Sequence, residues 1–140
     1  MITSVVITGC AGPVALPAPS PAPSARRTCD ALVAALPATV LDQDRRDTTA
    51  ALTAAWGDPP ITVSCGVAAP PGMTATAQCF EVDGVGWYAE EGTGGFLFST
   101  IGRSVVIEVG VPTAYAPEAN ALVDLAGAIT ATVPQTRPCV

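Results

Sequence analysis

The stretch Trp56–Gly66 constrains the fold most, because in it a rigid turn leads directly into a short alternating strand. Pro59 and Pro60 each fix φ and lack a backbone donor, so they suit the approach to a strand but not its middle. After them apolar residues alternate with hydroxyl residues, which is the period-2 pattern of a half-buried strand. We therefore expect the hydroxyl residues to face away from the core and the core positions to be Ile61, Val63 and Cys65.

Two hairpins are expected further along the chain. Asp83-Gly84 is typical of a two-residue type I′ turn, and this turn pairs Phe80 with Trp87. Gly102-Arg103 suits a type II′ turn, which pairs Phe98 with Ile107. The second hairpin then has one continuous apolar face, which we interpret as its core side and which contains Phe96, Phe98, Val105, Ile107 and Val109. The acidic and glycine-rich segment 89–95 between the hairpins is expected to be a mobile loop without a phosphate site, since no helix and no lysine follow it.

Helices are expected near both ends of the domain. Apolar residues recur at helical spacing from Cys29 to Leu36, with Thr28 as the N-cap. A second helix begins at about Pro117 and ends before Pro134, and its apolar stripe is Leu122, Leu125, Ala126, Ile129 and Val133. Residues 52–56 fit a short helix or a strand, and a strand is favoured because a turn follows so soon.

These patterns predict an α+β fold with an antiparallel sheet of about four to six strands built from hairpins. A short N-terminal helix and a C-terminal amphipathic helix pack on the sheet, and disulfides staple the domain. We expect three regions: a truncated signal and lipobox segment over residues 1–9, a lipidated cysteine and tether over 10–27, and a single domain over 28–140.

Composition excludes several partners. The chain has 140 residues, a net charge of −6, and neither lysine nor histidine, which argues against nucleic acid and phosphate as ligands. No run of about eighteen apolar residues is present, so no transmembrane helix is expected. A metal site is not expected, because no histidine and no close cysteine pair is available. The charged segment 42–47 resembles a calcium loop only faintly, since it lacks the glycine and the terminal glutamate.

The motif Ile7-Thr8-Gly9-Cys10 resembles a bacterial lipobox, in which small residues precede a cysteine that accepts a diacylglyceryl group. The segment that follows is rich in alanine, proline and serine, and we interpret it as an extended, solvated tether. A positively charged n-region and a full apolar h-region are missing, so either the true start lies upstream or the chain begins late. The alternative is a free cysteine in a cytosolic protein.

Four cysteines remain, an even number that suits two disulfides in an oxidising compartment. They allow three connectivities. Cys65 with Cys79, and Cys29 with Cys139, is the favoured pairing, because it closes one short loop and ties the ends of the domain together.

Catalysis is not expected, because the chain offers no histidine, no lysine and no G-x-S-x-G motif. Glu90 and Glu91 are adjacent and would point to opposite sides of a strand, so a pair of catalytic carboxylates needs another partner. No cofactor is implied.

Several motifs together resemble a bacterial family of domains of unknown function. The motifs are Cys29-Asp30-Ala31-Leu32, Arg45-Arg46, the stretch Trp56–Gly66, Cys79, Val82–Trp87 and Tyr115–Leu122. The resemblance spans about Thr28 to Cys139, and it implies a small exported or lipid-anchored protein of a high-GC Gram-positive bacterium. It implies no reaction and no catalytic residue. Ser64 departs from the pattern, since a basic residue is expected there, and the leader is unusually short.

The sequence therefore predicts an extracytoplasmic lipoprotein held on the outer face of the cell membrane through Cys10. Its expected function is that of a non-catalytic structural or protein-binding module with an envelope protein as partner. The alternative is a small-ligand or cell-wall-binding protein, for which Trp87 and Tyr88 are the candidate binding residues. An exposed aromatic pair would favour the ligand, and an apolar patch without a pocket would favour the protein partner.

Overall fold

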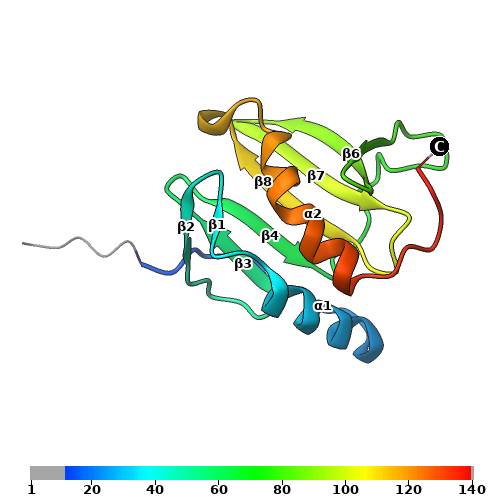
Figure 1. Ribbon diagram of the computed structural model, residues 1–140, viewed down its shortest axis with the longest axis horizontal. Coiled ribbons are helices and arrows are strands. Elements are labelled where there is room, and N and C mark those ends of the chain that lie inside the picture. The colour runs from blue at the N-terminus through cyan, green and yellow to red at the C-terminus, as the bar shows by residue number, and fades with distance from the viewer. Residues whose placement is uncertain (1–11, 140) are drawn as a thin grey trace, which may run out of the picture.

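The strand after the two prolines is β4 (Ile61–Cys65), and its alternating burial confirms that Ile61, Val63 and Cys65 face the core. The computed structural model describes residues 12–139. Over this range β4 is part of an antiparallel sheet with two helices on one face (Figure 1). The α+β class is therefore confirmed.

The sheet has eight strands rather than four to six, in the order β1-β2-β3-β4-β8-β7-β6-β5. One extra hairpin comes from the segment expected to be a charged loop, which forms a strand instead. The segment at residues 52–56 is a strand, as favoured. The other strands are β1 (Thr39–Val40), β2 (Gln43–Arg46), β3 (Thr53–Trp56), β5 (Phe80–Val82), β6 (Val85–Gly92), β7 (Gly95–Ile101) and β8 (Ile107–Pro112).

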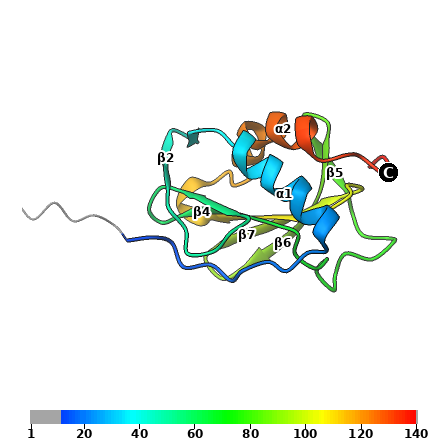
Figure 2. The same cartoon turned by 90° about the horizontal axis from the view of Figure 1, so that it is seen from below.

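Both helices lie on the same side of the sheet, as the edge-on view shows (Figure 2). Helix α1 (Pro23–Ala35) buries Cys29 and Leu32. Helix α2 (Asn120–Thr132) follows the short 3₁₀ helix η1 (Thr113–Tyr115), and the expected stripe is confirmed, because Leu122, Leu125, Ala126, Ile129 and Val133 are all buried. The core therefore lies between this face of the sheet and the two helices.

Both helices begin elsewhere than expected. Helix α1 starts at Pro23, whose fixed φ suits the first helical turn, and Thr28 lies inside it with its hydroxyl directed at the Ser24 carbonyl (3.4 Å). Helix α2 starts three residues after Pro117, because residues 117–119 form a turn in which the Asn120 amide donates to the Pro117 carbonyl (3.0 Å).

The first hairpin has the predicted register, with Phe80 opposite Trp87. The register of the second hairpin is wrong by two residues, since Phe98 pairs with Val109 rather than Ile107. The loop between β7 and β8 is longer than two residues because the C-terminal tail binds it: the Ser104 amide donates to the Pro134 carbonyl (2.9 Å). A shift of two keeps every side chain on its predicted face.

The glycine-rich segment 89–95 is not a loop. Strands β6 and β7 extend through it until Gly92 pairs with Gly95, so only Thr93 and Gly94 form the turn. The expectation of a mobile loop there is wrong, because glycine is typical not only of irregular backbone but also of strands where another group approaches closely.

The four cysteines form two disulfides, but the favoured pairing is wrong. Cys29 is bonded to Cys65 and joins α1 to the end of β4, and Cys79 is bonded to Cys139. Three strands separate β4 from β5 in the sheet, which places their ends roughly 19 Å apart at the usual strand spacing. Cys65 and Cys79 are therefore too far apart to bond, although the chain between them is short.

The segment before α1 is extended but is not a free tether. Val14 forms a parallel bridge with Thr48, donating its amide to the Asp47 carbonyl (2.9 Å). Further along, Pro21 lies against Gly66. The segment runs along the side of the sheet away from the helices (Figure 2). The ordered domain therefore begins well before residue 28.

Candidate functional site

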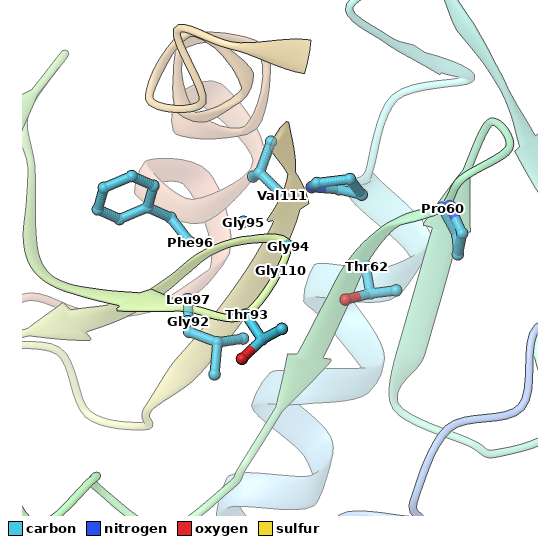
Figure 3. Close-up of a pocket in the computed structure, with 11 residues that line it drawn as sticks. Pro60, Thr62, Gly92, Thr93, Gly94, Gly95, Phe96, Leu97, Gly110 and Val111 are labelled. Carbon is cyan, nitrogen blue, oxygen red and sulfur yellow. The ribbon is translucent and has the colours of Figure 1, made fainter. Parts of the chain in front are cut away.

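The face of the sheet opposite the helices, called the open face below, carries a groove at one end. The β3–β4 turn, the β6–β7 turn and the end of β8 all lie at this end of the sheet. The groove is open to solvent and has a volume of about 350 Å³. Figure 3 shows Thr62 and Pro60 on one side, Leu97 and Thr93 on the other, and Gly110 between them.

Gly110 forms the floor of the groove. It pairs with Thr62 of β4 and with Leu97 of β7, so both side chains stand beside it on the open face. A Cβ at this position would come within 2.7 Å of the Thr62 hydroxyl, and its φ is not positive. The backbone conformation at position 110 does not require glycine. The space does, because the Thr62 hydroxyl lies where a side chain would begin.

Gly95 lies at the end of the groove for a different reason. A Cβ there would come within 2.9 Å of the Pro112 Cα and closer still to the Val111 carbonyl oxygen. The clash is with backbone of the paired strand, so Gly95 is needed for the pairing of β7 with β8.

An exposed apolar side chain stands between two carboxylates. Leu97 is 43% exposed, and Val123 on α2 is the other large apolar side chain that is well exposed among residues 12–139. Glu90 pairs with Leu97 across β6 and β7, while Glu108 precedes Gly110 by two residues on β8. All three side chains therefore point to the open face.

Burial raises the pKa of the Glu108 carboxyl, and the neighbouring Glu90 carboxylate raises it further. No cation contributes to this shift. Arg46 is on the same face, but its guanidinium donates to the carbonyls of Gly57 (2.8 Å) and Gly12 (3.0 Å). Three strands separate Arg46 from the strand of Leu97, so the part of the open face around Leu97 carries two carboxylates beside an apolar side chain.

The candidate aromatic pair does not form one binding surface, although Tyr88 lines a separate hollow together with Phe80. Trp87 is completely buried in the core, so its expected role at the surface is wrong. Tyr88 points to the open face and is half-buried, and its hydroxyl end lies against Gly72 of the loop between β4 and β5. Adjacent residues of a strand face opposite sides, so a pair in sequence could not form one platform.

The structure also shows which acidic side chains lie on the same face of the sheet. Glu90 shares its face with Glu108 rather than with Glu91, which pairs with Phe96 on the helical face. Residues 12–139 contain no cluster of three potential metal ligands, and they contain no helix long and apolar enough to cross a bilayer. Cys10, the expected lipidation site, lies outside the described residues.

A comparison with known protein families shows to which family the chain belongs. The family described as "Protein of unknown function (DUF3515)" matches residues 5–138. The chain belongs to this family. No curated protein and no solved structure matches it. The DUF3515 match begins before residue 28, in agreement with the N-terminal segment that packs on the sheet, and it names no activity.

The groove of this DUF3515 protein was missed in the sequence. The glycine-rich segment 89–95 was expected to be a loop, and no role was predicted for Gly110. One signal was present: Gly110 lies between Val109 and Val111 in a segment rich in β-branched residues, and a glycine inside a strand often marks a close approach of another group. Which strand lies beside it depends on the order of the sheet, which the sequence does not give.

Proposed function

We propose that this protein is an exported cell-envelope lipoprotein, anchored through Cys10, that binds an extended polypeptide segment in the groove of its open face. The bound segment carries a basic side chain next to an apolar one. The observation that carries the proposal is the position of Leu97, exposed between the Gly110 floor and two carboxylates.

Charge complementarity defines the partner. Glu90 and Glu108 lie on the same face beside the groove, and burial together with the Glu90 carboxylate raises the pKa of Glu108. A Lys or Arg side chain of a partner supplies that charge, while an adjacent apolar side chain covers Leu97. An extended segment fits because the groove is open to solvent, and because Gly110 has no side chain, a peptide backbone can lie close to it.

A small-ligand site is less well supported. Such sites usually bury most of the ligand in a concave pocket lined by aromatic side chains. This groove is shallow, and Trp87 does not reach the open face. A non-catalytic role is proposed because the chain has no histidine or lysine to activate Ser64 and Ser99, which pair with Glu108 across the strands. The described residues also contain no cluster of metal ligands. Turnover abolished by Glu108→Gln would overturn that part of the proposal.

Export is supported by the disulfides. Cys29–Cys65 and Cys79–Cys139 join segments 36 and 60 residues apart, and such structural bonds persist in oxidising compartments. With these four cysteines paired, Cys10 is left for another role, and its lipobox-like context makes lipidation the proposed one.

A peptide library tests the groove. The full chain is used to select binders from a random library of short peptides, and affinities are measured by calorimetry. We expect enriched peptides with Lys or Arg next to an apolar residue, bound at least tenfold more weakly by Gly110→Val, which fills the groove, and by Leu97→Ser. The control Val123→Ser, on the helical side, should bind as the wild type does. Enrichment of neutral or acidic peptides, or equal binding by Gly110→Val, would contradict the proposal.

A further inference from the structure

Residues 12–16, called the clasp below, are bound to the same end of the sheet that carries the groove. The Arg46 guanidinium donates to the Gly12 carbonyl (3.0 Å) and also to the Gly57 carbonyl (2.8 Å) in the β3–β4 turn. Gly57 is three residues from Pro60, which lines the groove. The first residue of the clasp is therefore tied to the groove end of the sheet.

The clasp is held by several further hydrogen bonds. The Val14 amide donates to the Asp47 carbonyl (2.9 Å), and the Thr49 amide donates to the Val14 carbonyl (3.0 Å). The Leu16 amide donates to the Thr49 hydroxyl (3.1 Å), and the Val14 side chain is 9% exposed. These bonds fix successive residues of the segment, so Gly12 does not move independently of the sheet.

From this geometry we infer that the clasp orients the domain on the membrane, with the groove end facing the lipid surface and the Cys79–Cys139 end facing away. The inference rests on the proposed lipidation of Cys10. Two peptide units separate Cys10 from Gly12, so their Cα atoms are at most about 7 Å apart. A lipidated Cys10 therefore brings the sheet end around Gly57 to the headgroups, in place of the long tether that the sequence predicted.

In this arrangement the anchor, not electrostatics, holds the domain at the membrane, because Asp44 and Asp58 offset Arg46 at this end. Asp44 and Asp58 flank Gly57, whose amide donates to the Asp44 carbonyl (3.0 Å). Carboxylates do not attract an anionic bilayer. The arrangement puts the groove within reach of a partner segment that emerges from the membrane, which deepens the function proposed above.

Fluorescence quenching by lipids tests the orientation. Full-length lipidated protein is purified, acylation of Cys10 is verified by mass spectrometry, and the protein is reconstituted into vesicles that contain lipids with a quencher in the headgroup region. A fluorescent non-canonical amino acid replaces either Thr93, in the turn at the groove end, or Thr74, in the exposed loop between β4 and β5 at the other end. We expect quenching at position 93 to be at least threefold stronger than at position 74.

Two variants show whether the clasp is responsible. A spacer of about ten glycine and serine residues between Ala11 and Gly12 adds roughly 18 Å of flexible chain and leaves the domain untouched. Arg46→Gln breaks the bond to Gly12 directly. Both should reduce quenching at position 93 to the level at position 74, and the spacer decides the question if Arg46→Gln does not fold.

The outcomes separate the two proposals. Equal quenching at the two positions in the unmodified sequence, or quenching at position 93 that the spacer leaves unchanged, would overturn the orientation while acylated Cys10 still supports the anchor. An unmodified Cys10 in protein from a lipoprotein-processing host would overturn both. Binding of the Cys10→Ala protein to the same vesicles would show that a surface other than the anchor holds the domain.

Discussion

At the scale of single residues, the Glu108 carboxyl on the open face makes the stability of the protein depend on pH. The Glu108 carboxyl is half-buried beside Glu90, and both burial and this neighbour raise its pKa. A raised pKa means that the folded protein binds the proton more tightly than the unfolded chain does. The free energy of unfolding therefore decreases as the pH rises from the ordinary glutamate pKa, about 4.3, to the raised value in the folded state.

Glu108→Gln tests this linkage. At pH 7 the variant should be more stable than the wild type, because it removes a charge from a half-buried position next to another carboxylate. The gain should disappear below the ordinary glutamate pKa, where both forms are neutral. Denaturant unfolding of both proteins across this pH range measures the effect, with Glu91→Gln on the exposed end of β6 as the control. A gain that persists at low pH would contradict the account.

Two glycines of the groove should respond differently to substitution. Gly95→Ala places a Cβ against the Val111 and Pro112 backbone, so we expect a loss of roughly 1–3 kcal/mol in the free energy of unfolding. Gly110→Ala meets only side chains, the Thr62 hydroxyl at 2.7 Å and the Leu97 Cδ2 at 3.6 Å, which can rotate, and it replaces a flexible glycine in a strand. Its stability should be unchanged or higher by up to about 1 kcal/mol. Equal losses at both positions would show that Gly110 is needed for the sheet rather than for the groove.

At the scale of elements, β4 connects the two halves of the sheet. It pairs with β3 on one side and with β8 on the other, and its core residues meet the helices. Val63 is 1% exposed, whereas Thr62 points to the open face. Val63→Ala should therefore lower the free energy of unfolding by roughly 1–3 kcal/mol, because it leaves a cavity.

Thr62→Ala is the matched variant on the same strand and should stay within about 0.5 kcal/mol of the wild type. Equilibrium denaturation with both disulfides intact compares the two, since loss of the Cys29–Cys65 bond would change the unfolded state. A larger loss at Thr62 than at Val63 would mean that the two faces of β4 have been exchanged.

Local sequence patterns predicted the helices and strands well, but they did not predict contacts between residues far apart in the chain. The alternation in β4 and the Asp83-Gly84 turn depend on neighbouring residues, and both were predicted correctly. The second hairpin register failed because the tail residue Pro134 binds the loop from far along the chain. The disulfide pairing failed because it depends on the order of strands, in which β4 and β5 are neighbours in sequence but not in the sheet.

At the scale of the whole molecule, the two faces of the sheet have separate roles. One face is closed by α1 and α2 (Figure 2) and supplies the core, and the other carries the groove. The candidate site was not predictable for this reason: Thr62, Gly110, Leu97 and Glu90 come from four strands and meet only once the strand order is known. The sequence instead suggested Trp87 and Tyr88 as binding residues, because these two aromatic residues are adjacent in the chain.

Site-specific photo-crosslinking in living cells tests the binding role of the groove most directly. A photoreactive amino acid replaces either Leu97 in the groove or Val123 on α2, which is 51% exposed on the other side of the molecule. The crosslinked peptide is then mapped by mass spectrometry.

The account predicts one dominant adduct from position 97, to an extended segment with a basic residue next to an apolar one. It also predicts that adding Gly110→Val reduces this adduct at least tenfold without lowering the denaturation midpoint. Adducts of equal yield and identity from positions 97 and 123, or an adduct from position 97 that Gly110→Val leaves unchanged, would contradict it.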